Sequence, residues 1–91
     1  MTDDRLALKR KRLLFRSVRR GTKESDLIIG GFAQAWLPRL DEGQLDRFEA
    51  LLEQNDPELL SWILGLKPPP PAHDHDVVRL IRSFKDSIPR N

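Results

Sequence analysis

Polar chemistry is concentrated in one short stretch, residues 19–26, which reads Arg-Arg-Gly-Thr-Lys-Glu-Ser-Asp. Arg20 offers a planar fork of N–H donors that suits carboxylates and phosphates. Gly21 can adopt a positive φ cheaply, so the chain can turn sharply there and a second backbone can approach closely. Glu24 and Asp26 add negative charge beside Arg20. The residue types alone leave two interpretations open: a contact surface for a charged partner, or, more simply, a helix stop, a cap and a weak surface ion pair.

The two histidines of the chain, His73 and His75, alternate with Asp74 and Asp76. Imidazole and carboxylate groups are metal ligands, so an enzyme with a metal site here is one interpretation, and it predicts stoichiometric metal in the purified protein. The run follows the four prolines of residues 68–71, where we expect a helix to begin and an aspartate to cap it. We therefore favour a structural role for this run.

Other catalytic constellations are missing from the sequence. There is no cysteine, which excludes disulfides, thiol catalysis and thiolate metal sites. No serine has an obvious base beside it, and carboxylate pairs such as Asp41-Glu42 look like helix-start residues. Gly30-Gly31 lacks the spacing of a phosphate-binding loop. We predict that the chain is not an enzyme and holds no cofactor or metal of its own.

Charge is divided unevenly along the chain. Residues 1–23 hold nine Lys and Arg against two Asp, whereas residues 24–91 hold seven against twelve Asp and Glu. Such a split indicates either a charged partner surface or pairing between the two parts of one fold. We expect the basic block Lys9-Arg10-Lys11-Arg12 to be largely solvated. The alternative function is a nucleic-acid-binding or regulatory adaptor that uses residues 5–20, although the later helices are acidic and offer no basic face for reading bases.

Helices must position these residues, because apolar residues recur at helical spacing and no strand pattern is present. With 91 residues, 38% of them hydrophobic, the chain is expected to form one domain over residues 1–91, with residues 1–4 and 89–91 frayed. No apolar run approaches the roughly 18 residues of a membrane span. We predict an all-α, compact five-helix bundle. Its helices are a first over about Asp3–Val18, a second capped by Thr22 and closed by Pro38, a third capped by Asp41, a fourth over about Pro57–Leu64 with Asp56 as cap, and a fifth from near Asp74 to Ile88.

The apolar positions of these helices define the expected core. Two glycines, Gly30 and Gly31, fall inside the second helix, where each costs about 0.5–1 kcal/mol relative to alanine. Their presence indicates close helix packing or the approach of a partner's backbone. The core-facing positions are Leu6, Leu13, Leu14, Phe15 and Val18, then Ile28, Phe32, Ala35 and Trp36, then Leu45, Phe48, Leu51 and Leu52, then Leu59, Leu60, Trp62, Ile63 and Leu64, and finally Val77, Ile81, Phe84 and Ile88.

The stretch Arg20-Gly21-x-x-Glu24-x-Asp26 resembles the signature of the succinate dehydrogenase assembly factors, also called FAD assembly factors. The resemblance covers about residues 10–85. Ser25 departs from the pattern, because an apolar residue is common there, and the Pro68–Pro71 loop is unusually rich in proline. Further matches follow in order: Arg12 to Ser17 before the signature, Asp26-Leu27 with Gly30 and Phe32, Phe48-Glu49-x-Leu51-Leu52, Asp56-x-x-Leu59, and Trp62-Ile63.

The resemblance implies a five-helix bundle that binds the FAD-containing subunit of succinate dehydrogenase, or of fumarate reductase, and promotes the covalent histidyl–flavin link in that partner. The FAD and the linking histidine belong to the partner. Carried over to this chain, Arg20, Gly21 and Glu24 form the contact surface, and Arg16 and Asp26 flank it. We further expect a monomer that binds no nucleic acid, does not insert into membranes, and resides in a bacterial cytoplasm rather than a mitochondrial matrix.

Overall fold

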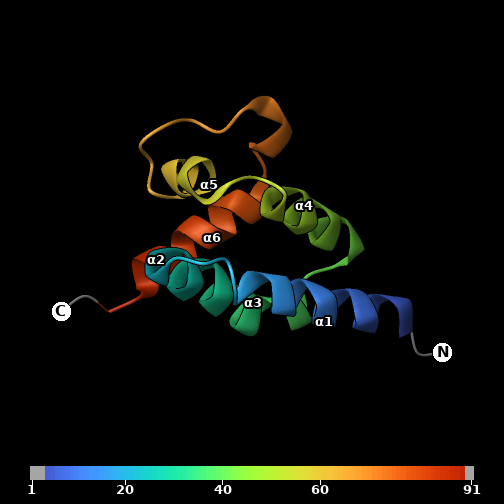
Figure 1. Cartoon of the computed structure of the whole chain (residues 1–91). Helices are drawn as coiled ribbons and strands as arrows, with labels where there is room; N and C mark the ends of the chain where they lie inside the picture. The colour runs from blue at the N-terminus through green and yellow to red at the C-terminus, as the bar shows by residue number, and fades with distance from the viewer. Residues whose placement is uncertain (1–3, 90–91) are drawn as a thin grey trace.

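Helices make up the regular structure of residues 4–89, the part of the chain that this computed structural model describes (Figure 1). Helices α2 and α3 are joined without a break by the π-helical turn η1, so these residues form the five helical segments that the sequence predicts. The prediction that residues 1–4 and 89–91 fray falls mostly outside the described residues, and within them Asp4 is already the first residue of α1. The elements are α1 (Asp4–Ser17), α2 (Lys23–Ser25), η1 (Asp26–Gly30), α3 (Gly31–Trp36), the 3-10 turn η2 (Leu37–Arg39), α4 (Glu42–Leu52), α5 (Asp56–Ile63), the 3-10 turn η3 (Pro71–His73) and α6 (Asp76–Ser87).

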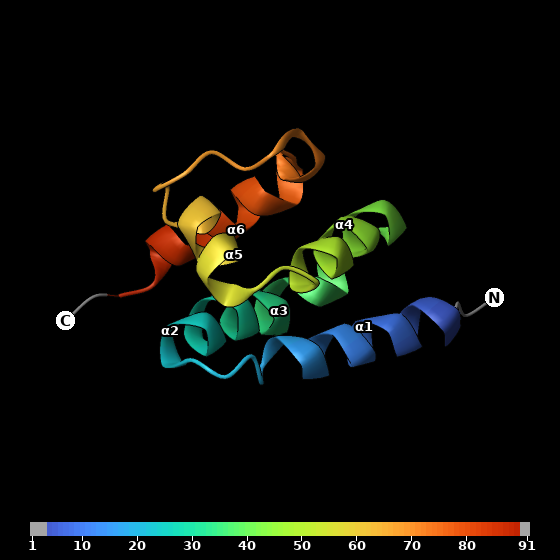
Figure 2. The ribbon, with the colours of Figure 1, turned by 45° about the horizontal axis from the view of Figure 1, so that its top comes forward.

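Helix α1 lies along one side of the molecule and packs against α3 and α4 (Figure 2). Helix α6 packs against α3, α4 and α5, so it joins the two halves of the chain. Helix α1 therefore packs one face against the bundle and leaves its other face exposed to solvent. Among residues 4–89, none of the helices combines the length and the apolar character that a membrane crossing needs.

One hydrophobic core lies between these helices, and Phe32 of α3 is at its centre. The Phe32 ring lies 5.6 Å from that of Phe48 and 6.1 Å from that of Phe84, centroid to centroid. Leu13 is the fully buried apolar residue of α1. The prediction was wrong for Phe15, which is 61% exposed, and also for Leu64, which is 36% exposed, and for Ala35, which is exposed. Because successive helical residues lie about 100° apart, Phe15 points about 200° away from Leu13 around the axis of α1.

Helix ends follow several of the predicted signals. The Thr22 side chain accepts a hydrogen bond from the backbone N–H of Ser25 at 3.2 Å. Asp41 and Gln44 form a reciprocal capping box at the start of α4. Gly65 ends α5 with a φ of +77°, which a residue with a side chain rarely adopts.

Two predicted caps were wrong by one residue. Asn55, not Asp56, caps α5, and its side chain accepts from the Glu58 backbone N–H at 2.9 Å. His75, not Asp74, caps α6. In the first case, the Asp56 carboxylate is held by a distant arginine, so the preceding asparagine takes the capping role. Local sequence does not show this competition.

The close approach predicted for Gly30 and Gly31 is confirmed. A Cβ atom on Gly30 would lie 3.3 Å from the Val18 Cα, just beyond α1, and a Cβ atom on Gly31 would lie 3.1 Å from the Phe84 ring of α6. The two glycines thus let the central helical segment approach both neighbours. The π-helical turn ends at Gly30, so the change in helix winding falls at the same point.

Candidate functional site

Arg20, a predicted contact residue just after α1, directs its guanidinium group into the protein. Its Nε donates to Asp56 Oδ1 at 2.5 Å, and its two terminal nitrogens donate to the carbonyls of Leu52 at 3.0 Å and Gln54 at 2.6 Å. The side chains of the ion pair are only 10% and 12% exposed. Since the guanidinium fork meets three acceptors at once, Arg20 ties the end of α1 to the turn between α4 and α5.

The turn after Arg20 is also fixed from within the chain. The Asp26 carboxylate accepts a hydrogen bond from the Arg20 backbone N–H at 2.9 Å. Gly21 has a φ of +108°, and a Cβ atom on it would meet nothing within 4 Å. Glycine is therefore required by the backbone conformation and not by lack of space, and the surface of the turn is open to another molecule.

Glu24 differs from Arg20 because the fold does not take up its side chain. It is exposed, and it makes no hydrogen bond or ion pair with the residues described in 4–89. It lines a groove of about 340 Å³ together with Leu27, Leu64 and Ile88. The local ion pair considered for Arg20 does not form, because the partner of Arg20 is Asp56, 36 residues further along the chain.

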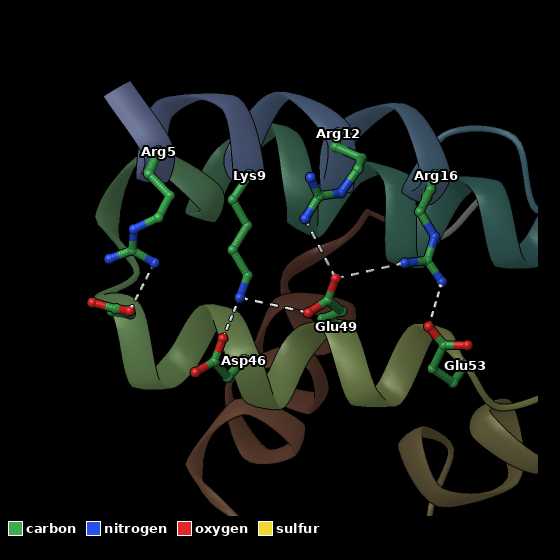
Figure 3. A network of polar contacts seen from close by, with 8 residues as sticks. Arg5, Lys9, Arg12, Arg16, Asp46, Glu49 and Glu53 are labelled. Atoms are coloured by element: carbon green, nitrogen blue, oxygen red, sulfur yellow. Dashed lines mark hydrogen bonds and ion pairs between the residues drawn. The ribbon is translucent and has the colours of Figure 1, made fainter. Parts of the chain in front are cut away.

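Arg16 belongs to a ladder of ion pairs between α1 and α4 (Figure 3). Its guanidinium group contacts Glu53 at 3.0 Å and Glu49 at 4.0 Å. The cations on α1 and the acids on α4 follow the same spacing of four, three and four residues, so the two helices run in the same direction. The pairs of the ladder are Arg5–Glu42, Lys9–Asp46, Arg12–Glu49 and Arg16–Glu53.

The expectation that the basic block of α1 is solvated holds for Lys11 and Arg12, which are exposed, and is wrong for Lys9 and Arg10. The Lys9 side chain is only 14% exposed, and its hydrogen bond to Asp46 raises the pKa of the amine. Arg10 donates to the backbone carbonyls of Leu37 at 2.9 Å and Leu40 at 2.7 Å. Much of the basic charge is thus used within the fold, which weakens the nucleic-acid interpretation because paired cations are less available to phosphates.

An open groove of about 520 Å³ lies beside the Arg20–Asp56 pair, and Phe15, Arg16, Arg19 and Asn55 complete its lining. The Arg19 guanidinium lies 4.8 Å from the centroid of the Phe15 ring. The groove therefore offers an aromatic surface beside a cation. The carboxylate in this groove belongs to Asp56 and is already paired with Arg20. The groove therefore suits the binding of an acidic or planar group better than it suits catalysis.

The histidine run serves the start of α6 and the core beneath it. Nδ1 of His75 accepts from the Val78 backbone N–H at 3.4 Å, and His73 stacks on Trp62 with ring centroids 5.2 Å apart. Asp76 accepts hydrogen bonds from two side chains of α4. Within residues 4–89, no group of three or more His, Asp or Glu is placed to hold a metal ion.

We expect His75 to make the bundle less stable in acid. Burial is the main cause that lowers the pKa of His75, so the unfolded chain, with a histidine pKa near 6.5, binds the proton more readily. This stability is complete above about pH 6.5 and is lost as the pH falls from there toward the folded-state pKa. Protonation also removes the Nδ1 acceptor of the cap.

Thermal unfolding at about pH 7.5 and about pH 5.5 tests this expectation, with a lower midpoint at the acidic pH. The variant His75→Asn can cap the helix without titrating in this range, so its midpoint should change less. An equal acid shift in both proteins would contradict the role of His75.

The fold and the site together define a small helical bundle whose candidate site is an open surface around the turn at residues 20–26. The family model described as flavinator of succinate dehydrogenase matches residues 11–85. This chain therefore belongs to that family, as the sequence resemblance predicts. The match spans the turn, the Arg20–Asp56 pair and the ladder pairs Arg12–Glu49 and Arg16–Glu53.

Individual relatives agree with the family match. The chain is 43% identical over 87 residues to the FAD assembly factor SdhE of Acetobacter pasteurianus, an alignment that covers 96% of this chain and 78% of that protein. It is 38% identical over 73 residues to the mitochondrial succinate dehydrogenase assembly factor 2 of Dictyostelium discoideum, covering 80% and 52%. For the Drosophila virilis factor of the same name, the identity is 33% over 90 residues, covering 97% and 57%. The chain thus spans little more than half the length of these mitochondrial relatives.

Proposed function

We propose that this chain is an assembly factor that binds the flavoprotein subunit of succinate dehydrogenase and promotes the covalent attachment of FAD to that subunit. The observation that carries the proposal is the family match over residues 11–85. The printed names of the relatives, which refer to FAD assembly and to succinate dehydrogenase, support it. In this proposal, the flavin and the histidine that receives it belong to the partner, and this chain supplies no reacting group.

The geometry supports different roles for the residues of the signature. Arg20 is a positioning residue, because its guanidinium group is taken up by Asp56 and two carbonyls. Asp26 fixes the same turn through the Arg20 backbone N–H. Gly21 and Glu24 are exposed and face solvent, so they are the residues free to touch the flavoprotein.

The contact would act by preorganisation. The Glu24 carboxylate can accept charge-assisted hydrogen bonds from N–H groups of the partner, and Gly21 lets a partner backbone come close. Binding in this way would hold the immature flavoprotein in a conformation in which its histidine and its flavin are within reach of each other. Holding two reacting groups in place lowers the entropic part of the barrier, although every reacting atom belongs to the partner.

Deletion of the gene tests the proposal in the cell of origin. The flavoprotein subunit is separated on a denaturing gel, and covalent flavin is read as in-gel fluorescence against the amount of subunit on an immunoblot. We expect the fluorescence to fall on deletion and to return when the wild-type chain is supplied. A subunit that stays fully fluorescent without this chain would overturn the proposal.

A further inference from the structure

The face of α1 that points away from the bundle carries a stripe of five residues that the fold itself does not use as core. Leu8 and Phe15 are 65% and 61% exposed, although large apolar side chains are usually covered. Spacings of three and four residues place the first four of these side chains on one face of α1, and the fifth follows just beyond the end of the helix at Ser17. We call this face the outer stripe, and it consists of Leu8, Lys11, Arg12, Phe15 and Arg19.

Two of the three cations of the outer stripe lie outside the ladder, and Arg12 is shared by both. Lys11 and Arg19 have no acidic partner within residues 4–89, and the Arg19 guanidinium instead covers the Phe15 ring. Arg12 reaches Glu49 only at 3.6 Å and keeps 58% of its side chain exposed. One face of α1 is thus neutralised by α4, while the adjacent face, which begins at Arg12, keeps positive charge beside apolar surface.

The outer stripe is continuous with the groove next to Arg20. Leu8, Lys11, Arg12, Phe15 and Arg16 line a groove of about 580 Å³. Phe15 and Arg16 also line the groove of about 520 Å³ that contains the Arg20–Asp56 pair. A molecule bound in the groove beside Arg20 could therefore extend along α1 without leaving this surface.

We propose that the outer stripe docks an acidic amphipathic segment of the flavoprotein partner. This inference rests on the proposed function and adds to it the chemistry of the segment that is recognised. Leu8 and Phe15 lie about 10 Å apart along the helix axis, so they fit two apolar side chains of the segment. Carboxylates between and beside these side chains would meet Lys11, Arg12 and Arg19, and such charge complementarity speeds encounter and fixes register.

Two other kinds of occupant fit the stripe less well. A phosphate backbone requires a track of available cations, whereas here apolar side chains interrupt the cations and the neighbouring positive charges are paired with α4. A helix that lies in a membrane surface needs a wide apolar face, and this stripe has two large apolar residues. Both occupants are tested below as alternative outcomes.

The test measures the affinity of the purified full chain for the purified flavoprotein subunit. We expect Phe15→Ala to weaken binding about tenfold or more, because an exposed aromatic anchor would be lost, and Phe15→Leu to weaken it less. The double variant Lys11→Glu with Arg19→Glu should also weaken binding, and more at ~0.01 M salt than at ~0.15 M, where the Debye length is only ~8 Å. Leu66→Ala, at an apolar side chain that is 75% exposed elsewhere, is the matched control and should bind like wild type. Circular dichroism verifies that each variant is folded.

The outcomes separate this inference from the function on which it rests. If wild type binds the flavoprotein and the stripe variants bind equally well, the inference is overturned and the proposed function stands. It is likewise overturned if the stripe variants bind the flavoprotein like wild type but bind RNA or anionic phospholipid vesicles more weakly than wild type does. If wild type does not bind the flavoprotein at all, the proposed function fails as well. Selective weakening by the stripe variants, with Leu66→Ala unchanged, supports the inference.

Discussion

Replacing Arg20 with alanine is expected to lower the free energy of unfolding by about 3 kcal/mol. The change removes the guanidinium group that Asp56 and the Leu52 and Gln54 carbonyls all use, and it leaves a nearly buried carboxylate without its partner. Small domains are stable by only about 5–15 kcal/mol, so this is a large fraction of the total. Denaturant unfolding followed by circular dichroism measures the effect.

Two further variants sharpen the test of Arg20. Arg19→Ala removes a neighbouring arginine that has only a surface contact with the Phe15 ring, so its cost should stay below about 1 kcal/mol. Arg20→Lys keeps the charge but loses the planar fork, and it should therefore fall between wild type and alanine. If Arg20→Ala unfolds at the same denaturant concentration as wild type, the buried pair does not stabilise the bundle.

Replacing Glu24 with alanine should have the opposite effect from replacing Arg20. We expect a large loss of function with little loss of stability. Glu24 is exposed and has no partner within residues 4–89, and its contribution at the start of α2 is at most about 1 kcal/mol through the helix dipole. If Glu24 contacts the flavoprotein, covalent flavin in cells that carry only this variant should fall about tenfold or more, as for a contact at the centre of an interface.

In-gel flavin fluorescence, normalised to the subunit and to the level of the variant, measures this effect. Glu42→Ala is the matched control, because it also removes an exposed carboxylate but lies at the start of α4 and pairs with Arg5. Normal flavin in cells with Glu24→Ala would exclude Glu24 from the contact surface. A variant that loses both flavin and stability would instead indicate that Glu24 acts through the fold.

The helical architecture follows from local rules, which explains why the sequence predicts it well. Capping by Thr22 and by Asp41 with Gln44 depends on residues three positions apart, so the pattern is visible in the chain itself. The caps at Asn55 and His75 were missed because an aspartate next to each looked equally suitable. At the start of α5, Asp56 is held by Arg20, and this contact between distant residues is not visible in the local sequence.

The candidate site depends on distances between helices, so only part of it could be predicted. The signature places Arg20 and Glu24 in one turn, but their opposite orientations follow from the position of Asp56, 36 residues beyond Arg20. The resemblance includes Asp56 among its matches, yet the residue was interpreted as a helix cap. The outer stripe was missed because Phe15 was assigned to the core.

The ladder between α1 and α4 is visible in the sequence as a matching spacing of charged residues. Its four cations and four acids repeat the same spacing, and every main pair is separated by 37 residues. Matching the two patterns would have predicted parallel neighbouring helices. The uneven charge of the chain was correctly considered as possible pairing within one fold, and the prediction of a solvated basic block was wrong for Lys9 and Arg10.

Covalent flavin formation with purified components tests the central proposal most directly. The flavoprotein subunit, prepared without covalent flavin from cells that lack this chain, is mixed with FAD in the presence or absence of the purified chain, and in-gel fluorescence is followed with time. The proposal predicts that the wild-type chain accelerates the appearance of covalent flavin and that Glu24→Ala does so far less. Equal rates with and without the wild-type chain would contradict it.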